Sequence, residues 1–353
     1  MIDIFKDILT YISGLYTLPW ILVGFVITIL LTKITKREKI DKIMKKIGLI
    51  LLYFFIPVLV FRIFLNTDFG KNEIQFAIVV SLIVFLMYIL AFVFAWYKVK
   101  SWHLKGSKKQ LFIKTVLTNQ GRSSAFIGGA LLASPWKIEA AIYIALVGIA
   151  LFAIIPYILS YMHKKETKNK EHKQVKALPW YLKLYPWYLI AFVIAGVGIH
   201  GLTGITTKNL GHDLEIIVMF YSAITIPAAL YYVGAGIDPN DLKKTELRKL
   251  VGYDKSDKTV DHWTWVRGIF ILTVILTPIL TTLVFAPFFA LGIISSAWFA
   301  VIIINSILPI TSTNMFLLPY GIDRKSTAHA VTWTTIVCVP IVVLLITIFG
   351  IYG

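Results

Sequence analysis

Two stretches of polar residues lie inside otherwise apolar parts of this chain. The first is TNQGRSS, residues 118–124, and the second is NSILPITSTN, residues 305–314. Side-chain amides and hydroxyls can donate and accept hydrogen bonds, and arginine adds a permanent positive charge. Such groups are costly in lipid, where they normally pair with one another or line a path for a substrate. These stretches are therefore the places where the sequence could do chemistry.

Each stretch contains a residue that can interrupt a helix. Pro309 lacks an N–H group and clashes with the preceding turn, and Gly121 permits a break. A broken helix leaves backbone groups without partners, which is tolerated only in a protein-lined or wet cavity. Helix N-termini suit anions, whereas exposed carbonyls suit cations. The alternative is that these residues simply hold neighbouring helices together.

We interpret the two breaks as one substrate- or ion-binding site. The predicted site residues are Asn119, Gln120, Gly121, Arg122, Ser123, Ser124, Asn305, Pro309, Thr311, Ser312, Thr313 and Asn314. Arg122 follows Lys114 by eight residues, which is about 12 Å along a helix. That depth is awkward for a side chain that must reach the interface. We therefore expect Arg122 to face the pocket and to bind the carboxylate of a small organic anion.

The elements that position these residues are long apolar segments. Of 353 residues, 58% are hydrophobic, more than in typical soluble domains. The segments are long enough to cross a bilayer, which needs about 20 apolar residues. The sequence predicts an all-α polytopic membrane protein embedded in the lipid bilayer. Its ten predicted spans are 15–33, 47–65, 74–97, 111–133, 138–161, 185–205, 215–236, 266–288, 292–317 and 327–350.

The basic residues follow this division into spans. The net charge is +17, but Lys and Arg sit in short loops rather than on one face, so nucleic acid is not an expected partner. Their numbers in successive loops are 7, 1, 6, 1, 7, 1, 7, 0 and 2. By the positive-inside rule, the rich loops are cytoplasmic, including a basic linker at 162–184. We expect a multi-pass protein of the cell membrane with both termini outside, and Trp263 and Trp265 as interface anchors.

The two halves of the chain resemble each other. Residues 19–27 read PWILVGFVI and residues 186–194 read PWYLIAFVI, with six of nine positions identical. Five spans per half would insert the second half upside down, as in many secondary transporters. We therefore predict two inverted five-helix repeats, 1–161 and 185–353, with broken helices 4 and 9 crossing at the site.

Three further features stand out: IPAALYYVGAG (226–236), PITSTN followed by YGID (309–314, 320–323), and Thr334 or Thr335 with Pro340. In these features the chain resembles the auxin efflux carrier family, which is similar in fold to bile acid sodium symporters. Span 4 departs from the family pattern N-x-G-x-x-G-x-P: Ser123, Ala125, Gly128 and Ala130 stand at its four fixed positions.

The resemblance implies a mechanism and a mode of assembly. Scaffold helices 1, 2, 6 and 7 would support a mobile core of helices 3–5 and 8–10, as in an elevator-type carrier, and would pair in a homodimer. The crossover role of the family carries over to Ser123, Gly128, Pro309 and Asn314 only.

The expected function is secondary transport of a small organic anion. The alternative is a sodium-coupled symporter of a neutral or steroid-like solute, so the coupling ion is left open between Na+ and H+. An enzyme is not expected, because the sequence has no HExxH, no GxSxG and no paired mid-span carboxylates. No cofactor or metal is expected either, since the one cysteine, Cys338, has no Cys/His cluster around it.

Overall fold

The computed structural model describes residues 19–66, 70–122, 136–168, 179–237, 239–251 and 261–352. They are helical apart from short connections, and one isolated β-bridge joins Arg122 to Ile310. The α-helices are α2 (Pro19–Ile34), α3 (Arg37–Ile50), α4 (Ile56–Leu65), α5 (Lys71–Ser101), α6 (Gly106–Thr118), α8 (Lys137–Ile149), α9 (Ile155–Lys168), α10 (Trp180–Thr203), α11 (His212–Gly236), α12 (Lys244–Val251), α13 (His262–Phe270), α14 (Thr277–Ala290), α15 (Ser296–Ile307) and α16 (Arg324–Tyr352).

Within the described residues, six helical stretches are long and apolar enough to cross a membrane: Glu38–Leu65, Ile74–Ser101, Leu146–Lys164, Trp180–Thr203, His262–Ala290 and Arg324–Phe349. Two shorter helices, Leu22–Ile34 and Ser296–Ile307, are also apolar. The prediction of an all-helical, membrane-embedded chain is thus supported at this coarser level. Ten spans and an inverted repeat stay predictions.

The exposed surface of α5 has the character of a lipid-facing helix. Ile78, Leu82, Phe85 and Ile89 repeat at helical spacing, and between 43% and 65% of each is exposed. The opposite side of the same helix carries buried residues such as Val80 and Ile83. A helix that is apolar all round fits a membrane, where both the protein interior and the lipid are apolar.

Three long helices change to π-helix immediately before a proline. The π-helical segments are η2 (Leu51–Phe55), η3 (Ala150–Ile154) and η6 (Ile271–Leu276), followed by Pro57, Pro156 and Pro278. Proline cannot donate to the carbonyl one turn earlier, and its ring crowds that turn. A π-turn widens the helix there, so the helix continues through the proline instead of ending.

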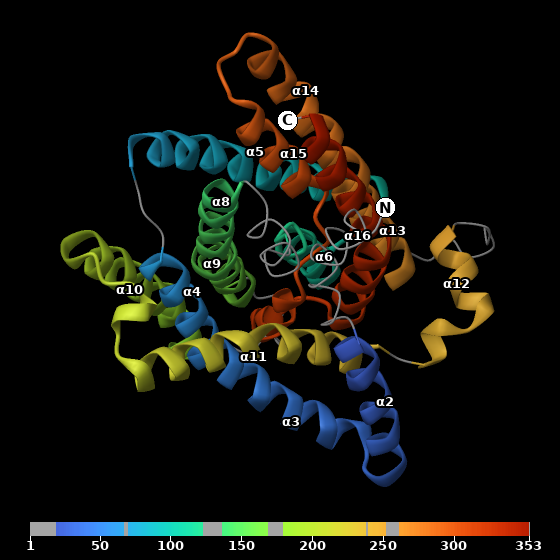
Figure 1. The fold of residues 1–353 in the computed structure, drawn as a ribbon. Coiled ribbons are helices and arrows are strands. Elements are labelled where there is room, and N and C mark those ends of the chain that lie inside the picture. Colours follow the sequence, from blue (N-terminus) through green and yellow to red (C-terminus); the bar gives the residue numbers. More distant parts are fainter. Residues whose placement is uncertain are drawn as a thin grey trace, which may run out of the picture.

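The helices pack in two groups (Figure 1). In one, α2 lies along α11, and α4 packs against both α10 and α11. In the other, α5 packs against α6 and α8, and α16 packs against α13 and α15. The helix α6 lies near the centre of the ribbon view, while α2, α3 and α11 lie along one side. The groups meet where α11 contacts α16 and the 3-10 segment η7 (Ser312–Tyr320), and where α4 contacts α8.

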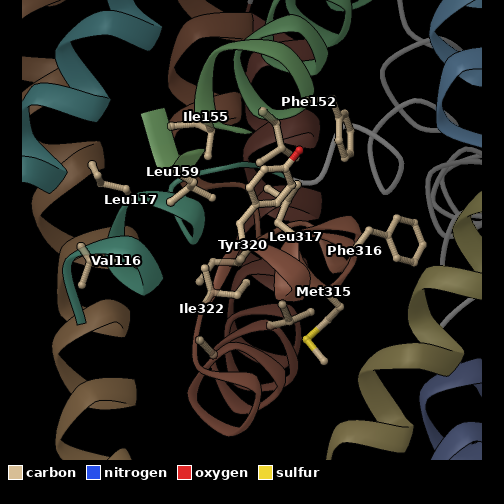
Figure 2. Close-up of a cluster of buried hydrophobic side chains, with 14 of the residues drawn as sticks. Val116, Leu117, Phe152, Ile155, Leu159, Met315, Phe316, Leu317, Tyr320 and Ile322 are labelled. Carbon is tan, nitrogen blue, oxygen red and sulfur yellow. The ribbon is translucent and has the colours of Figure 1, made fainter. Parts of the chain in front are cut away.

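A hydrophobic cluster fills the space between α6, α9 and η7 (Figure 2). It includes Val116 and Leu117 from α6, Phe152 from η3, and Ile155 and Leu159 from α9. From η7 and the turn after it come Met315, Phe316, Leu317, Tyr320 and Ile322. These side chains hold the ends of the two broken helices in a fixed relation to each other.

Several helices run further than their apolar segments predicted. The helix α9 continues to Lys168 and α10 begins at Trp180, so both ends of the predicted 162–184 linker are helical. In the same way, α5 extends to Ser101, with Lys98 and Lys100 in its last turn. Basic side chains near a helix C-terminus complement its dipole, so a helix can continue past its apolar part into polar surroundings.

The prediction for Trp263 and Trp265 is wrong. Trp263 is fully buried and only 7% of Trp265 is exposed. The Trp263 ring lies 4.6 Å from the His329 ring, and the Trp265 ring lies 5.1 Å from the Phe112 ring, between ring centroids. Both indoles pack between α13 and its neighbours rather than at a lipid interface, because aromatic partners on α6 and α16 cover them.

Candidate functional site

The first break follows the end of α6 at Thr118. The next backbone bonds are short-range: Gln120 N donates to Leu117 O (3.2 Å) and Gly121 N donates to Thr118 O (3.1 Å). The helix therefore tightens over one turn and then opens into an extended segment. Asn119, Gln120, Gly121 and Arg122 are all buried there, with 1% or less of Asn119, Gln120 and Arg122 exposed. The helix α6 thus ends three residues before Gly121, and the second half of the predicted span 4 lies outside the described residues.

The second break lies between the end of α15 at Ile307 and the start of η7 at Ser312. Pro309 stands in the extended connection, as its missing N–H predicts. The two breaks meet directly: Arg122 and Ile310 form an antiparallel bridge, and Thr311 N donates to Gly121 O (2.9 Å). Residues from opposite halves of the sequence are thus joined by their backbones.

The amides of Asn119 and Gln120 tie the first break to three other helices. Asn119 Nδ2 donates to Thr115 O (2.8 Å) and to Thr327 Oγ1 on α16 (3.2 Å). Gln120 Nε2 donates to Met87 O on α5 (3.2 Å) and to Thr277 Oγ1 on α14 (3.4 Å). Neighbouring side chains therefore leave the turn after α6 toward different helices and fix its position among them.

Arg122 is buried and its guanidinium group bonds to backbone carbonyls. Nη1 donates to Leu308 O (3.4 Å) and Nη2 donates to Thr273 O in η6 (3.1 Å). Its titratable neighbours are Tyr88, Tyr143 and Cys338. In the described part of the chain, no carboxylate forms an ion pair with Arg122. Among the described residues, the hydrogen-bond partners of this charge are these two backbone carbonyls.

Asn314 lies beside Gly121 on the other side of the extended segment. A Cβ at Gly121 would lie 2.9 Å from Asn314 Oδ1 and 2.8 Å from Leu151 Cδ1. The Asn314 side chain is fully buried, yet neither its Oδ1 nor its Nδ2 has a hydrogen-bond partner among the described residues. Glycine at position 121 is what allows this amide to approach the break.

The other predicted site residues have local roles or lie outside the described structure. Asn305 Nδ2 donates to Val301 O within α15 (2.7 Å), and the Thr311 and Thr313 hydroxyls are 2.8 Å apart. Ser312 is the first residue of η7. The predicted site residues Ser123 and Ser124, together with Gly128, lie outside the described residues, so their part in the site stays a prediction.

Buried polar atoms without partners gather where the breaks meet. Among the described residues, those near the crossover are Thr118 Oγ1, Asn119 Oδ1, Gln120 Oε1, Arg122 Nε, and both polar atoms of the Asn314 amide, with the Tyr88 hydroxyl close by. Other such atoms, for example Tyr185 Oη and Trp333 Nε1, lie elsewhere in the described residues. An unpaired polar group in a membrane interior costs several kcal/mol. Native proteins rarely leave such atoms unpaired, so a cluster of them indicates a place for water or a ligand.

Two backbone oxygens at the crossover already have a cationic partner. Carriers that bind Na+ near broken helices use backbone carbonyls of the unwound segments. Here two such oxygens, Leu308 O and Thr273 O, already accept hydrogen bonds from Arg122. A separate observation is that, in the described residues, no group of three or more His, Cys, Asp or Glu side chains is placed to hold a metal ion.

A cavity of about 490 Å³ lies apart from the crossover. Asn72 and Phe76 of α5, Glu139 of α8 and Trp298 of α15 are among its lining residues. None of its lining residues belongs to either break. The predicted topology would place it on the outer side of the membrane.

Sequence reasoning missed the partners that the breaks find on other spans. Tyr88 and Tyr143 lie near Arg122, Thr273 and Thr277 receive hydrogen bonds, and Thr334 Oγ1 accepts from Ile310 N (3.1 Å). One signal was available: Thr273 and Thr277 lie five residues and one residue before Pro278 in an otherwise apolar span. The tyrosines gave no signal, because aromatic residues are common throughout this chain.

Comparison with known proteins adds no relationship to this geometry. No protein-family model matches the chain, and no curated protein matches it in sequence.

Proposed function

We propose that this protein is a secondary transporter of a small organic anion, and a carrier rather than an enzyme. The observation that supports this most is the cluster of unpaired, buried polar atoms at the point where α6 and α15 break. Broken helices meeting in the protein interior are the usual place for a substrate in transporters built from repeats. A purely structural junction would pair these atoms with one another.

The helix packing supports two inverted five-helix repeats. In the proposed repeat, α2 and α4 belong to spans 1 and 2, whereas α10 and α11 belong to spans 6 and 7. The first span of each half packs against the second span of the other half, because α2 lies along α11 and α10 lies along α4. If the two halves of the chain are interchanged, span 1 against span 7 becomes span 6 against span 2, so the set of contacts is the same. A repeat related by a two-fold axis requires this.

The same contacts support a division into scaffold and core. The proposed scaffold is α2, α4, α10 and α11, which would also form the homodimer. The proposed core holds α5, α6, α8, α9 and α13–α16, with both breaks inside it. Polar contacts between the two are few among the described residues: Tyr320 Oη donates to Leu182 O (2.7 Å) and Arg324 Nη2 donates to Ala235 O (2.9 Å). Elevator-type movement of the core would break both.

The anionic character of the substrate rests on Arg122. Its charge is buried and, among the described residues, no acidic side chain balances it. Electrostatic attraction grows as the local dielectric constant falls, so an anion near the crossover would be strongly favoured. The unpaired Asn314 amide offers both a donor and an acceptor for the rest of such a solute.

Binding of a panel of mono- and dicarboxylates to the purified protein in nanodiscs tests this proposal. The variant Asn314→Ala removes the unpaired amide, and Ser81→Ala is the control, because Ser81 is exposed on α5 and bonds only to Ala77 O in its own helix. We expect at least one carboxylate to bind wild type and Ser81→Ala equally and Asn314→Ala more weakly. Binding of none of them to wild type, or equal binding to Asn314→Ala, would contradict the proposal.

A further inference from the structure

The π-helical segment η6 releases a backbone carbonyl inside the core. Thr277 N donates to Leu272 O, five residues earlier, instead of to Thr273 O. In a π-turn the hydrogen-bond donor to Thr273 O would be the N–H group of residue 278, but this residue is Pro278 and has none. Neither of the two usual helical donors therefore reaches Thr273 O, so this carbonyl points out of the helical ladder.

A second carbonyl is released at the break after α15. Leu308 caps the C-terminus of α15, and Pro309 follows it. The Leu308 carbonyl thus lies at the negative end of a half-helix, where the dipole favours a cation. Two electron-rich oxygens from spans 8 and 9 face the same place next to span 4.

Arg122 supplies the cation for both oxygens. Nη2 lies 3.1 Å from Thr273 O and Nη1 lies 3.4 Å from Leu308 O. Because Arg122 also belongs to the bridge with Ile310, its side chain and backbone join spans 4, 8 and 9 at one point. The guanidinium group is permanently charged, so this cation cannot leave or be deprotonated under ordinary conditions.

A sodium ion coordinated by these two carbonyl oxygens would compete with the guanidinium group for both of them. It would also stand within a few ångström of a buried guanidinium, where two like charges repel strongly at low dielectric. We propose that Arg122 is a tethered cation that takes the place of a coupling ion at the crossover, so that the site forms and binds its anion without Na+. The anion rests on the proposed function, whereas the tethered cation rests on the Arg122 contacts alone.

The test measures thermal unfolding of the detergent-purified protein without any substrate, in sodium chloride or choline chloride. For wild type we expect the same unfolding midpoint in both salts. Arg122→Ala leaves two carbonyls without a donor, so its midpoint should fall. Millimolar guanidinium or Na+ should then raise this midpoint saturably by a few degrees, since a ligand that binds only the folded protein stabilises it.

The matched control is Arg62→Ala, which removes another in-span arginine, on α4, away from the crossover. Its midpoint should not respond to low guanidinium, so the comparison subtracts any general effect of that ion. If Arg122→Ala does not fold, Arg122→Lys is the second variant. It keeps the positive charge but has one ammonium group in place of the guanidinium group, so it should fold with a midpoint below that of wild type.

Two outcomes would overturn the inference. One is a saturable stabilisation of wild type by Na+ over choline. The other is an Arg122→Ala protein that folds and responds to neither guanidinium nor Na+. Both outcomes differ from a failure of the proposed function. If no carboxylate binds but the unfolding midpoints respond to cations as expected, the proposed substrate is wrong and the tethered cation still stands.

Discussion

At the scale of single residues, the crossover depends on the pair Gly121 and Asn314. The glycine leaves room for an amide that has no partner among the described residues, and the amide lies beside the backbone of the first break. Both residues were predicted as part of the site from the matched polar stretches. Their direct approach could not be predicted, because it requires the two stretches to pair by their backbones.

Gly121→Ala should therefore destabilise the protein. Its Cβ would meet Leu151 Cδ1 at 2.8 Å and Asn314 Oδ1 at 2.9 Å. Overpacking a buried position costs about 1–3 kcal/mol. Chemical unfolding in detergent would measure this loss, with Gly148→Ala in α8 as the control, because a Cβ there meets nothing within 4 Å. An unchanged stability of Gly121→Ala would show that the break does not have the described geometry.

The hydrogen-bond partners of Arg122 could not be predicted from the sequence. Its burial was expected from its distance to Lys114, but Lys114 does not mark the exposed end of the span, because its own side chain is only 2% exposed. The bonds from Arg122 to Thr273 O and Leu308 O depend on how span 8 is rotated about its own axis. A span that is apolar on all sides does not encode that rotation in its hydrophobic pattern.

At the scale of elements, prolines decide where helices bend and where they break. Pro57, Pro156 and Pro278 each follow a π-turn and leave their helices continuous, whereas Pro309 stands in a true break. All four residues were visible in the sequence, but their different outcomes were not. The difference lies in the neighbours: Pro309 is followed by Ile310 and Thr311, whose N–H groups donate to Thr334 Oγ1 and Gly121 O.

The close packing of α2 against α11 gives a prediction for one of these elements. A Cβ at Gly24 would lie 2.1 Å from Tyr231 O, which is impossible without separating the two helices. Gly24→Ala should lower the unfolding midpoint, whereas Gly198→Ala in α10, with nothing within 4 Å, should not.

Helix separation at Gly24 would act on the proposed scaffold rather than on the crossover. The variant should therefore lose stability while its residual folded fraction still binds carboxylate. A Gly24→Ala protein as stable as wild type would contradict the packing of α2 along α11.

At the scale of the whole molecule, the alternation of basic loops gives an orientation that the structure itself does not carry. Lys105, before α6, belongs to a loop predicted to be cytoplasmic, and Lys208, after α10, belongs to a loop predicted to be outside. Both side chains are exposed. The helical, membrane-embedded character of the chain was predictable, because it depends on the length and composition of each segment rather than on contacts between segments.

Cysteine labelling in intact cells tests this orientation. The single native cysteine, Cys338, is buried, so a Cys338→Ala background removes the remaining thiol with little disturbance. A membrane-impermeant maleimide should label Lys208→Cys in this background and should label Lys105→Cys only after the cells are opened. The reverse pattern would invert the proposed topology, and labelling of both from outside would contradict the count of spans between them.

Solute counterflow in proteoliposomes tests the central claim most directly. Vesicles preloaded with one carboxylate and diluted into a trace of the same labelled solute should accumulate label when they contain wild type or Ser81→Ala. Asn314→Ala should lose about tenfold or more of this rate, since a hydrogen bond to a charged solute is worth about 1.5–3 kcal/mol. Absence of counterflow for every carboxylate in the wild type, or full counterflow in Asn314→Ala, would contradict transport at the crossover.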